Sequence, residues 1–161
     1  MSPYLRQLRA LVGHRLLVLA SVAVFVWDER GRLLLVREAE TRKWQTIGGA
    51  VEPDESPLQA AVREAAEEAG VAIEIDGIRG VAGGPRFRLR YANGDLVGYV
   101  ATMLDAHVVS GEPRADQDET IDVAWFTPEQ LASAELTEFT VALFETAGVG
   151  QGVGTPPASR R

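Results

Sequence analysis

The sequence contains no cysteine, which excludes disulfide bonds, thiolate zinc sites and a cysteine nucleophile together. It also has no basic run beyond the terminal Arg160-Arg161, and its 16 basic against 23 acidic residues give a net charge of −7. Such a chain is unsuited to general binding of nucleic acid or of anionic membrane surfaces. We therefore expect a soluble, cytoplasmic protein with no nucleic-acid or membrane partner.

Long hydrophobic runs are absent as well. The most apolar segment, Leu16 to Trp27, is shorter than the roughly 20 residues that a membrane span needs. It follows several arginines, as the apolar part of a secretory leader would. However, the turn-forming residues 28–31 and a second apolar stretch over 32–37 come next, and this order is typical of a β-hairpin. We favour the hairpin over the leader.

The remaining pattern predicts an α/β fold, with a mixed sheet between helical layers. Asn93-Gly94 favours a tight hairpin turn between two of the strands. We expect one domain over residues 1–147 and a disordered tail over 148–161, which is rich in Gly, Pro and Ser. The predicted helices cover 3–12, 56–68, a short segment from Thr127, and 138–147; the predicted strands cover 16–27, 32–37, 44–47, 73–81, 86–91, 96–109 and 121–126.

The helix over 56–68 has the clearest boundaries. Ser56 and Gln59 have the spacing of a capping box, and Gly70 suits a left-handed C-terminal cap. Helical spacing places Leu58, Val62, Ala65 and Ala69 on one apolar face. The same geometry predicts that three glutamates share the opposite face: Glu64, Glu67 and Glu68.

This placement of the glutamates destabilises the helix. Carboxylates at i and i+4 repel each other, and these lie near the helix C-terminus, where the helix dipole is negative. Each effect costs several tenths of a kcal/mol. A divalent cation would relieve the repulsion, and oxygen ligands favour Mg²⁺ or Mn²⁺ over zinc. The alternative is a solvated acidic face, which is the commoner origin of such clusters.

The surrounding residues favour the metal site. Gly49, five residues, Glu55, seven residues, and then the run Arg63 to Val71 (REAAEEAGV) match the Nudix box at every specified position. In this respect the chain resembles the Nudix hydrolase family. The segments 44–49 and 123–128 also resemble those that flank the box in the family. One departure is Ile47, which stands where many members have proline.

The resemblance implies an α/β/α sandwich and hydrolysis of a nucleoside diphosphate linked to another moiety. It implies that Glu64, Glu67 and Glu68 bind Mg²⁺ or Mn²⁺ and serve catalysis, with the Gly48 carbonyl as a further ligand. Two other box residues, Glu55 and Arg63, would hold the helix start and orient these ligands.

A general base is also implied, and in many relatives it comes from a later loop. The candidates there are Asp116, Asp118 and Glu119, with Glu64 as another alternative. We favour Glu119, because it directly precedes the strand over 121–126.

Substrate contacts are predicted from residue type alone. Trp44 could stack on a base, and Arg37, Arg86 and Arg88 could contact phosphate. Alternation along the strand over 86–91 would place Arg86, Arg88 and Arg90 on one face, with Phe87 and Tyr91 opposite. We expect a small nucleotide substrate of the ADP-ribose, nucleotide-sugar or (d)NTP class.

Three related functions compete with this interpretation. Isopentenyl diphosphate isomerases share the fold but depend on a cysteine, which this chain lacks. An mRNA-decapping enzyme should carry a basic path for RNA. A ligand-sensing module usually has a degraded box and a second, DNA-binding domain, whereas the box here is complete. The sequence leaves a homodimer open.

Overall fold

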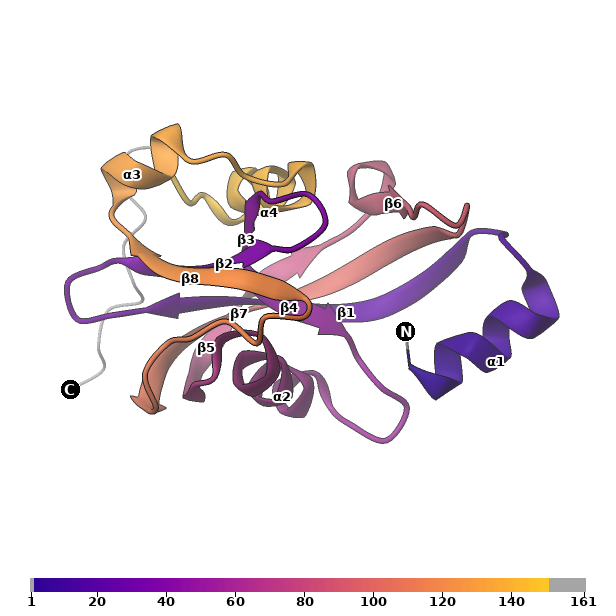
Figure 1. Ribbon diagram of the computed structural model, residues 1–161, viewed down its shortest axis with the longest axis horizontal. Helices are drawn as coiled ribbons and strands as arrows, with labels where there is room; N and C mark the ends of the chain where they lie inside the picture. The colour runs from indigo at the N-terminus through magenta and orange to yellow at the C-terminus, as the bar shows by residue number, and fades with distance from the viewer. Residues whose placement is uncertain (1, 151–161) are drawn as a thin grey trace.

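The computed structural model describes residues 2–150, in which a mixed eight-stranded sheet lies between helices (Figure 1). The strand order is β3-β2-β1-β7-β5, with β4 paired to β1, β6 to β7 and β8 to β2. The elements are α1 (Pro3–Val12), β1 (Leu17–Trp27), β2 (Leu33–Glu38), β3 (Trp44–Gln45), β4 (Ile47–Ala50), α2 (Pro57–Ala69), β5 (Ala72–Ala82), the 3-10 helix η1 (Pro85–Phe87), β6 (Arg88–Arg90), β7 (Leu96–Ser110), β8 (Thr120–Phe126), α3 (Pro128–Ser133) and α4 (Glu138–Ala147).

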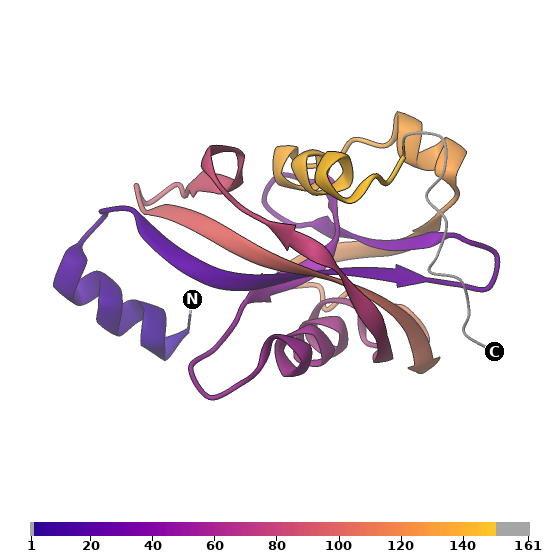
Figure 2. The same ribbon diagram turned by 180° about the vertical axis from the view of Figure 1, so that it is seen from behind.

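Helices cover both faces of the sheet, and alternate residues of its central strands build two separate cores. Val22, Val24 and Val26 of β1 pack toward α2, whereas Ala23 and Phe25 pack toward α4. Figure 2 shows α2 and α4 on opposite sides of the strands, with α1 projecting from one end. The expected α/β/α arrangement is therefore confirmed.

The β1–β2 hairpin is confirmed at the segment that resembled a secretory leader. Val26 pairs with Leu34, and Trp27 pairs with Leu33. Within residues 2–150, no helix is both long and apolar enough to cross a membrane.

The prediction of a strand over residues 86–91 was wrong for its first two residues. Pro85 follows Gly84, which has a φ of 96°, and the chain makes a 3-10 turn in which the N–H of Phe87 donates to the Gly84 carbonyl. The strand begins only at Arg88, so Arg86 does not alternate with Arg88 and Arg90 along one strand.

Apolar and polar residues alternate poorly along β5, and its irregular pairing accounts for this. Its pairing with β7 shifts register at three places, after Ala72, Ile75 and Ile78. Exposed and less exposed residues alternate from Ala72 to Arg79, and the alternation breaks at Gly80, beside the third shift. Ile78 and Val81 are exposed while Arg79 is not, so the apolar residues themselves follow no regular alternation.

The chain continues to pack on the core beyond Ala147, the last residue of the predicted domain. Gly148 caps the helix with a φ of 70°, and Val149 is buried against the α4 side of the core. The rest of the predicted tail, residues 151–161, lies outside the described residues.

Candidate functional site

Helix α2 begins and ends where its capping residues predict. The Ser56 hydroxyl accepts the N–H of Gln59 at 3.3 Å, and the Gln59 side chain accepts the N–H of Ser56 at 2.8 Å. Gly70 adopts the left-handed conformation at the other end. The capping box and the glycine cap are both confirmed, and they fix the helix that carries the acidic residues.

The buried face of α2 differs from the predicted one. Leu58 and Val62 are 47% and 42% exposed, whereas Glu64 and Glu68 are only 9% and 6% exposed. The prediction that all three glutamates face away from the apolar side was therefore wrong for these two. Small side chains surround them and let the helix lie close to the sheet; the buried residues of α2 are Ala60, Ala61, Glu64, Ala65, Glu68 and Ala69.

Two glycines of β4 make room for the buried carboxylates. A Cβ atom at Gly49 would lie 2.2 Å from Oε1 of Glu64, so any larger residue would displace that carboxylate. The N–H of Gly48 donates to Oε2 of Glu68 at 3.0 Å. Ile47, the departure from the usual proline, is fully buried and pairs with Val24.

The surroundings of Glu64 and Glu68 disfavour their negative charges. Burial raises the pKa of Glu68 well above its ordinary value, and the charges of Glu64, Glu119 and Asp116 raise it further, against the opposing effect of the Gly48 N–H. Burial also raises the pKa of Glu64, and Arg63 only partly offsets this. A bound proton or cation would relieve this unfavourable charge.

Arg63 ties the start of the helix to its acidic face. Its guanidinium donates to both carboxylate oxygens of Glu55, at 2.6 and 3.0 Å, and to the Ala50 carbonyl at 3.2 Å. The same group contacts Glu64 at 2.8 Å and Glu67 at 3.1 Å. Hydrogen bonds from Arg63 keep the pKa of Glu55 below its ordinary value. Glu55 and Arg63 thus lie where they can orient the acidic face.

Glu67 lies apart from the buried pair. Its side chain is 59% exposed and pairs with Arg63. Within residues 2–150, no three His, Cys, Asp or Glu side chains are grouped closely enough to hold a metal ion by themselves. Magnesium commonly uses one or two carboxylates, with water and substrate phosphates completing its shell. The two buried carboxylates of Glu64 and Glu68, whose negative charges are unfavourable and which lie next to the backbone of two glycines, are suited to binding such an ion.

The loop that carries Glu119 reaches the same end of α2. The charge of Glu119 raises the pKa of both Glu64 and Glu68, which places it within electrostatic range of the pair. The carboxylate of Asp116, another candidate for the base, is instead engaged within the loop, because its Oδ1 accepts the N–H groups of Asp118 and Thr120 at 2.8 and 2.9 Å. Sequence reasoning missed Thr120, whose hydroxyl contacts α2; a lone threonine at a strand start gives no signal of this.

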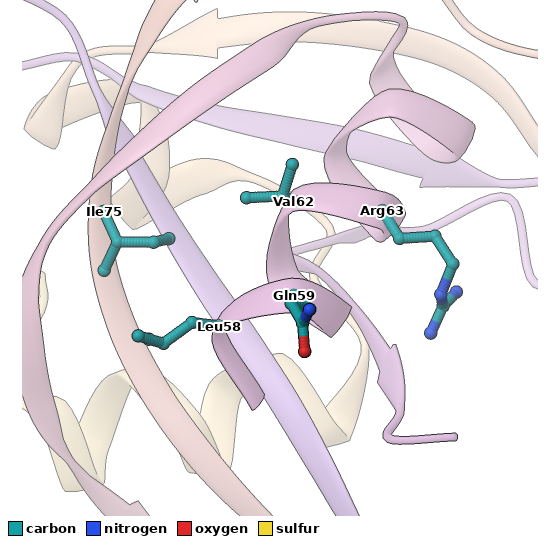
Figure 3. Close-up of a pocket in the computed structure, with 5 residues that line it drawn as sticks. All are labelled: Leu58, Gln59, Val62, Arg63 and Ile75. Carbon is teal, nitrogen blue, oxygen red and sulfur yellow. The ribbon is translucent and has the colours of Figure 1, made fainter. Parts of the chain in front are cut away.

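Two hollows flank α2. One of about 410 Å³ lies beside its last turn and is lined by Ala66, Glu67, Gly70, Arg114, Ala115 and Asp116. The other, of about 430 Å³, is lined by Leu58, Gln59, Val62, Arg63 and Ile75. Figure 3 shows that the Arg63 side chain points away from the apolar residues of this second hollow. Only the first hollow lies on the side of the Glu119 loop.

The predicted substrate residues lie on β2, β3, β6 and η1. The Arg37 guanidinium lies 5.9 Å from the ring centre of Trp44, which makes a T-shaped contact with Phe126 in the core beneath α4. Arg86 pairs with Glu145 of α4 at 2.6 Å.

Arg88 lies on β6, opposite Gly98. In the described part of the chain, none of the four predicted substrate residues hydrogen bonds or ion-pairs with Glu64 or Glu68: Trp44, Arg37, Arg86 and Arg88.

Comparison with known proteins identifies the family. The model of the NUDIX domain matches residues 18–146. The chain belongs to the Nudix family. Members of this family hydrolyse pyrophosphate bonds in nucleoside diphosphate derivatives and generally use divalent metal ions, so the chain is a Nudix hydrolase by family.

Individual relatives agree with this assignment. The chain is 32% identical to a MutT-like protein of Streptomyces ambofaciens, over 78% of this chain and 74% of that one. It is 31% identical to a putative 8-oxo-dGTP diphosphatase of Bacillus subtilis, over 67% of this chain and 66% of the relative. A MutT Nudix hydrolase from Burkholderia pseudomallei matches with a TM-score of 0.66 and 29% identity, over 80% of this chain and 97% of that one.

Proposed function

We propose that this Nudix protein is a metal-dependent hydrolase of small nucleotides, with its reaction centre at the Glu64–Glu68 pair. The observation that carries the proposal is the burial of these two carboxylates against Gly48 and Gly49, where desolvation and mutual repulsion oppose their charges. A protein gains nothing in stability from such a pair, so its presence favours a role in binding a cation.

Glu64 and Glu68 would hold Mg²⁺ or Mn²⁺, with the Gly48 carbonyl beside them and Glu67 recruited from its exposed position. When bound, the ion neutralises diphosphate charge and lowers the pKa of a bound water. Arg63 restrains Glu64 while it is itself held by Glu55 and by the Ala50 carbonyl. This arrangement limits the conformations of the ligands before substrate arrives.

Glu119 is the proposed general base. It lies in electrostatic range of both buried glutamates, and it directly precedes β8 (Thr120–Phe126). In this role it takes a proton from the attacking water while Glu64 and Glu68 remain committed to the ion.

The proposed substrate is a small nucleotide rather than RNA. One relative is named a putative 8-oxo-dGTP diphosphatase, and another, 29% identical, is named a nucleoside triphosphatase. These names favour the (d)NTP class within the range that the sequence predicted, next to ADP-ribose and nucleotide sugars. With Arg86 engaged by Glu145, the chain has even less of a basic path for a polymer than the sequence implied. A cytoplasmic location and a single domain form part of the same proposal; the domain contains the predicted residues 1–147 and extends to Val149, which packs in the core.

A substrate panel tests the proposal. The measurement is kcat/KM for dGTP, 8-oxo-dGTP, ADP-ribose, UDP-glucose and a short capped RNA, with Mg²⁺, with Mn²⁺ and with EDTA at one ionic strength. We expect metal-dependent turnover of at least one small nucleotide. Turnover of the capped RNA ten times faster than every small substrate would contradict the substrate class, and undiminished turnover in EDTA would contradict the role of the metal.

A further inference from the structure

The segment from Arg114 to Thr120 is fastened to the last turn of α2. The Thr120 hydroxyl donates to the Glu68 carbonyl at 2.8 Å, and the N–H of Arg114 donates to the Ala69 carbonyl at 2.9 Å. Both carbonyls lie at the C-terminal end of the helix, where backbone acceptors have no partner within the helix. Thr120 itself is completely buried, so water cannot replace its hydroxyl there.

Thr120 also holds the loop together from within. Its N–H donates to Oδ1 of Asp116 at 2.9 Å, and its carbonyl accepts the N–H of Gln117 at 2.9 Å. Gln117 adopts a φ of 68°, which is unfavourable for a residue with a side chain, so these bonds sustain a turn that the chain would not otherwise favour.

The carbonyl of Glu119 is fixed on its other side by β2. It accepts the N–H of Ala39 at 3.0 Å, one residue beyond Glu38, which pairs with Thr120. The backbone of Glu119 is therefore held between the end of β2 and the last turn of α2. On the α2 side, the side chain of the neighbouring Thr120 makes the contact, and it ends on the backbone carbonyl of Glu68.

We infer that Thr120 is a positioning residue that sets the placement of Glu119 relative to the Glu64–Glu68 pair. The hydroxyl joins the loop that carries the general base to the helix that carries the metal ligands, and so fixes the distance between the loop and the helix. This inference rests on the proposed function, because it assigns Glu119 and Glu68 to one reaction. It goes beyond that function in naming the residue on which their relative placement depends.

Amide hydrogen exchange tests the fastening without any need for turnover. In Thr120→Val, which keeps the side-chain shape but loses the hydroxyl, we expect exchange at residues 118–120 and at Ala39 to be at least about tenfold faster than in the wild-type protein. Exchange in α4 should be unchanged. Unchanged exchange at the loop would overturn the inference, even for a protein that hydrolyses no nucleotide of the panel. Inactivity of the wild-type protein would contradict the proposed function separately.

Kinetics test the consequence for catalysis. We expect Thr120→Val to lower kcat about 10- to 100-fold with KM within about threefold, because a displacement of about 1 Å has effects of this size. Thr120→Ser restores the hydroxyl and should recover kcat to within about threefold. In a Glu119→Gln background, Thr120→Val should add less than about a threefold further loss. Independent, multiplying losses would overturn the inference, and so would a serine variant as impaired as the valine variant.

Thr146→Val is the matched control. The Thr146 hydroxyl donates to the Ala142 carbonyl at 2.8 Å, which is the same kind of bond, on α4 and across the sheet from α2. Its loss should leave kcat within about twofold of the wild-type value. A loss of kcat as large as that of Thr120→Val would show that any missing threonine hydroxyl impairs the enzyme, and would overturn the assignment.

Discussion

The negative charge of Glu68 is strongly disfavoured by its surroundings in the folded protein. Glu68 is 6% exposed on the buried face of α2, and the contact that stabilises its charge is the hydrogen bond from the Gly48 N–H. Burial raises its pKa, so the folded protein without metal retains a proton that the unfolded chain has already released above its ordinary pKa of 4.5. Stability therefore falls as pH rises through the range from about 4.5 to the raised pKa.

Glu68→Gln should abolish this decrease in stability with rising pH. Without metal, in EDTA, the variant should gain stability relative to the wild-type protein as pH rises above about 4.5, because glutamine has no proton to release. Glutamine also retains an oxygen that can accept the Gly48 N–H. The measurement is the difference in Tm between the two proteins over a pH series, in which contributions from carboxylates with lowered pKa, such as Glu55, cancel. A difference that does not change with pH would contradict the raised pKa of Glu68.

At this scale, the sequence predicted the identity of the acidic residues but not their burial. The spacing of Glu64, Glu67 and Glu68 was sufficient to expect a cluster. Helical spacing placed Ala65 and Ala69 correctly on the buried face, but it could not show that Ala60 and Ala61, rather than Leu58 and Val62, join them there. Hydrophobicity favours the larger side chains as core, whereas the close approach of α2 to β4 selects the smaller ones.

The contact between β4 and α2 is the element-scale feature on which the site depends. Gly49→Ala would place a Cβ 2.2 Å from Oε1 of Glu64 and so displace that carboxylate. We expect kcat to fall about 10- to 100-fold, the range for misplaced catalytic groups. Gly77→Ala is the control, since nothing lies within 4 Å of a Cβ there, and it should leave kcat unchanged. Equal kcat values for the two variants would show that the close approach has no part in catalysis.

The opposite layer is held by a buried ion pair with no part in the proposed reaction. Oδ1 of Asp105 accepts the Trp27 indole N–H at 2.9 Å and the Arg79 guanidinium at 2.6 Å, while Arg79 also reaches the Ala147 carbonyl at the end of α4. Asp105→Ala leaves that guanidinium without its partner, and such a loss costs about 3–5 kcal/mol.

Urea denaturation measures this cost. We expect a lower midpoint for Asp105→Ala, with kcat near the wild-type value at temperatures where the variant is folded. A variant as stable as the wild-type protein would contradict the structural role of the pair, and a large loss of kcat in the folded variant would show that this layer contributes to the site.

Elements were predicted well where local signals agree with the tertiary structure. The capping box at Ser56 forms, a short helix begins after Thr127 as predicted, and the helix over 138–147 has the predicted bounds. The prediction failed at Arg86, where alternation suggested a strand but Pro85 starts a 3-10 turn. The link between Thr120 and α2 spans 52 residues of sequence, and no local pattern encodes a contact of that range.

For the molecule as a whole, metal binding and folding should be linked. The native state holds Glu64 and Glu68 together, whereas the unfolded chain does not, so an ion that binds the pair stabilises the fold. At a concentration 100 times its Kd, it adds about 2.7 kcal/mol. We expect a higher Tm in millimolar Mn²⁺ than in EDTA at equal ionic strength, and a smaller difference in Glu68→Gln. Equal Tm values for the wild-type protein in both conditions would contradict a metal site.

Hydrolysis should require a metal ion held by the buried carboxylates of α2. The decisive measurement is kcat for the wild-type protein and for Glu68→Gln, on whichever small nucleotide the wild-type protein hydrolyses best, at saturating Mg²⁺ or Mn²⁺. The substitution removes one charge from the pair and leaves its shape, so we predict a loss of at least about 10²-fold, on the scale of preorganised charge stabilisation. A kcat within a few-fold of the wild-type value would contradict the account.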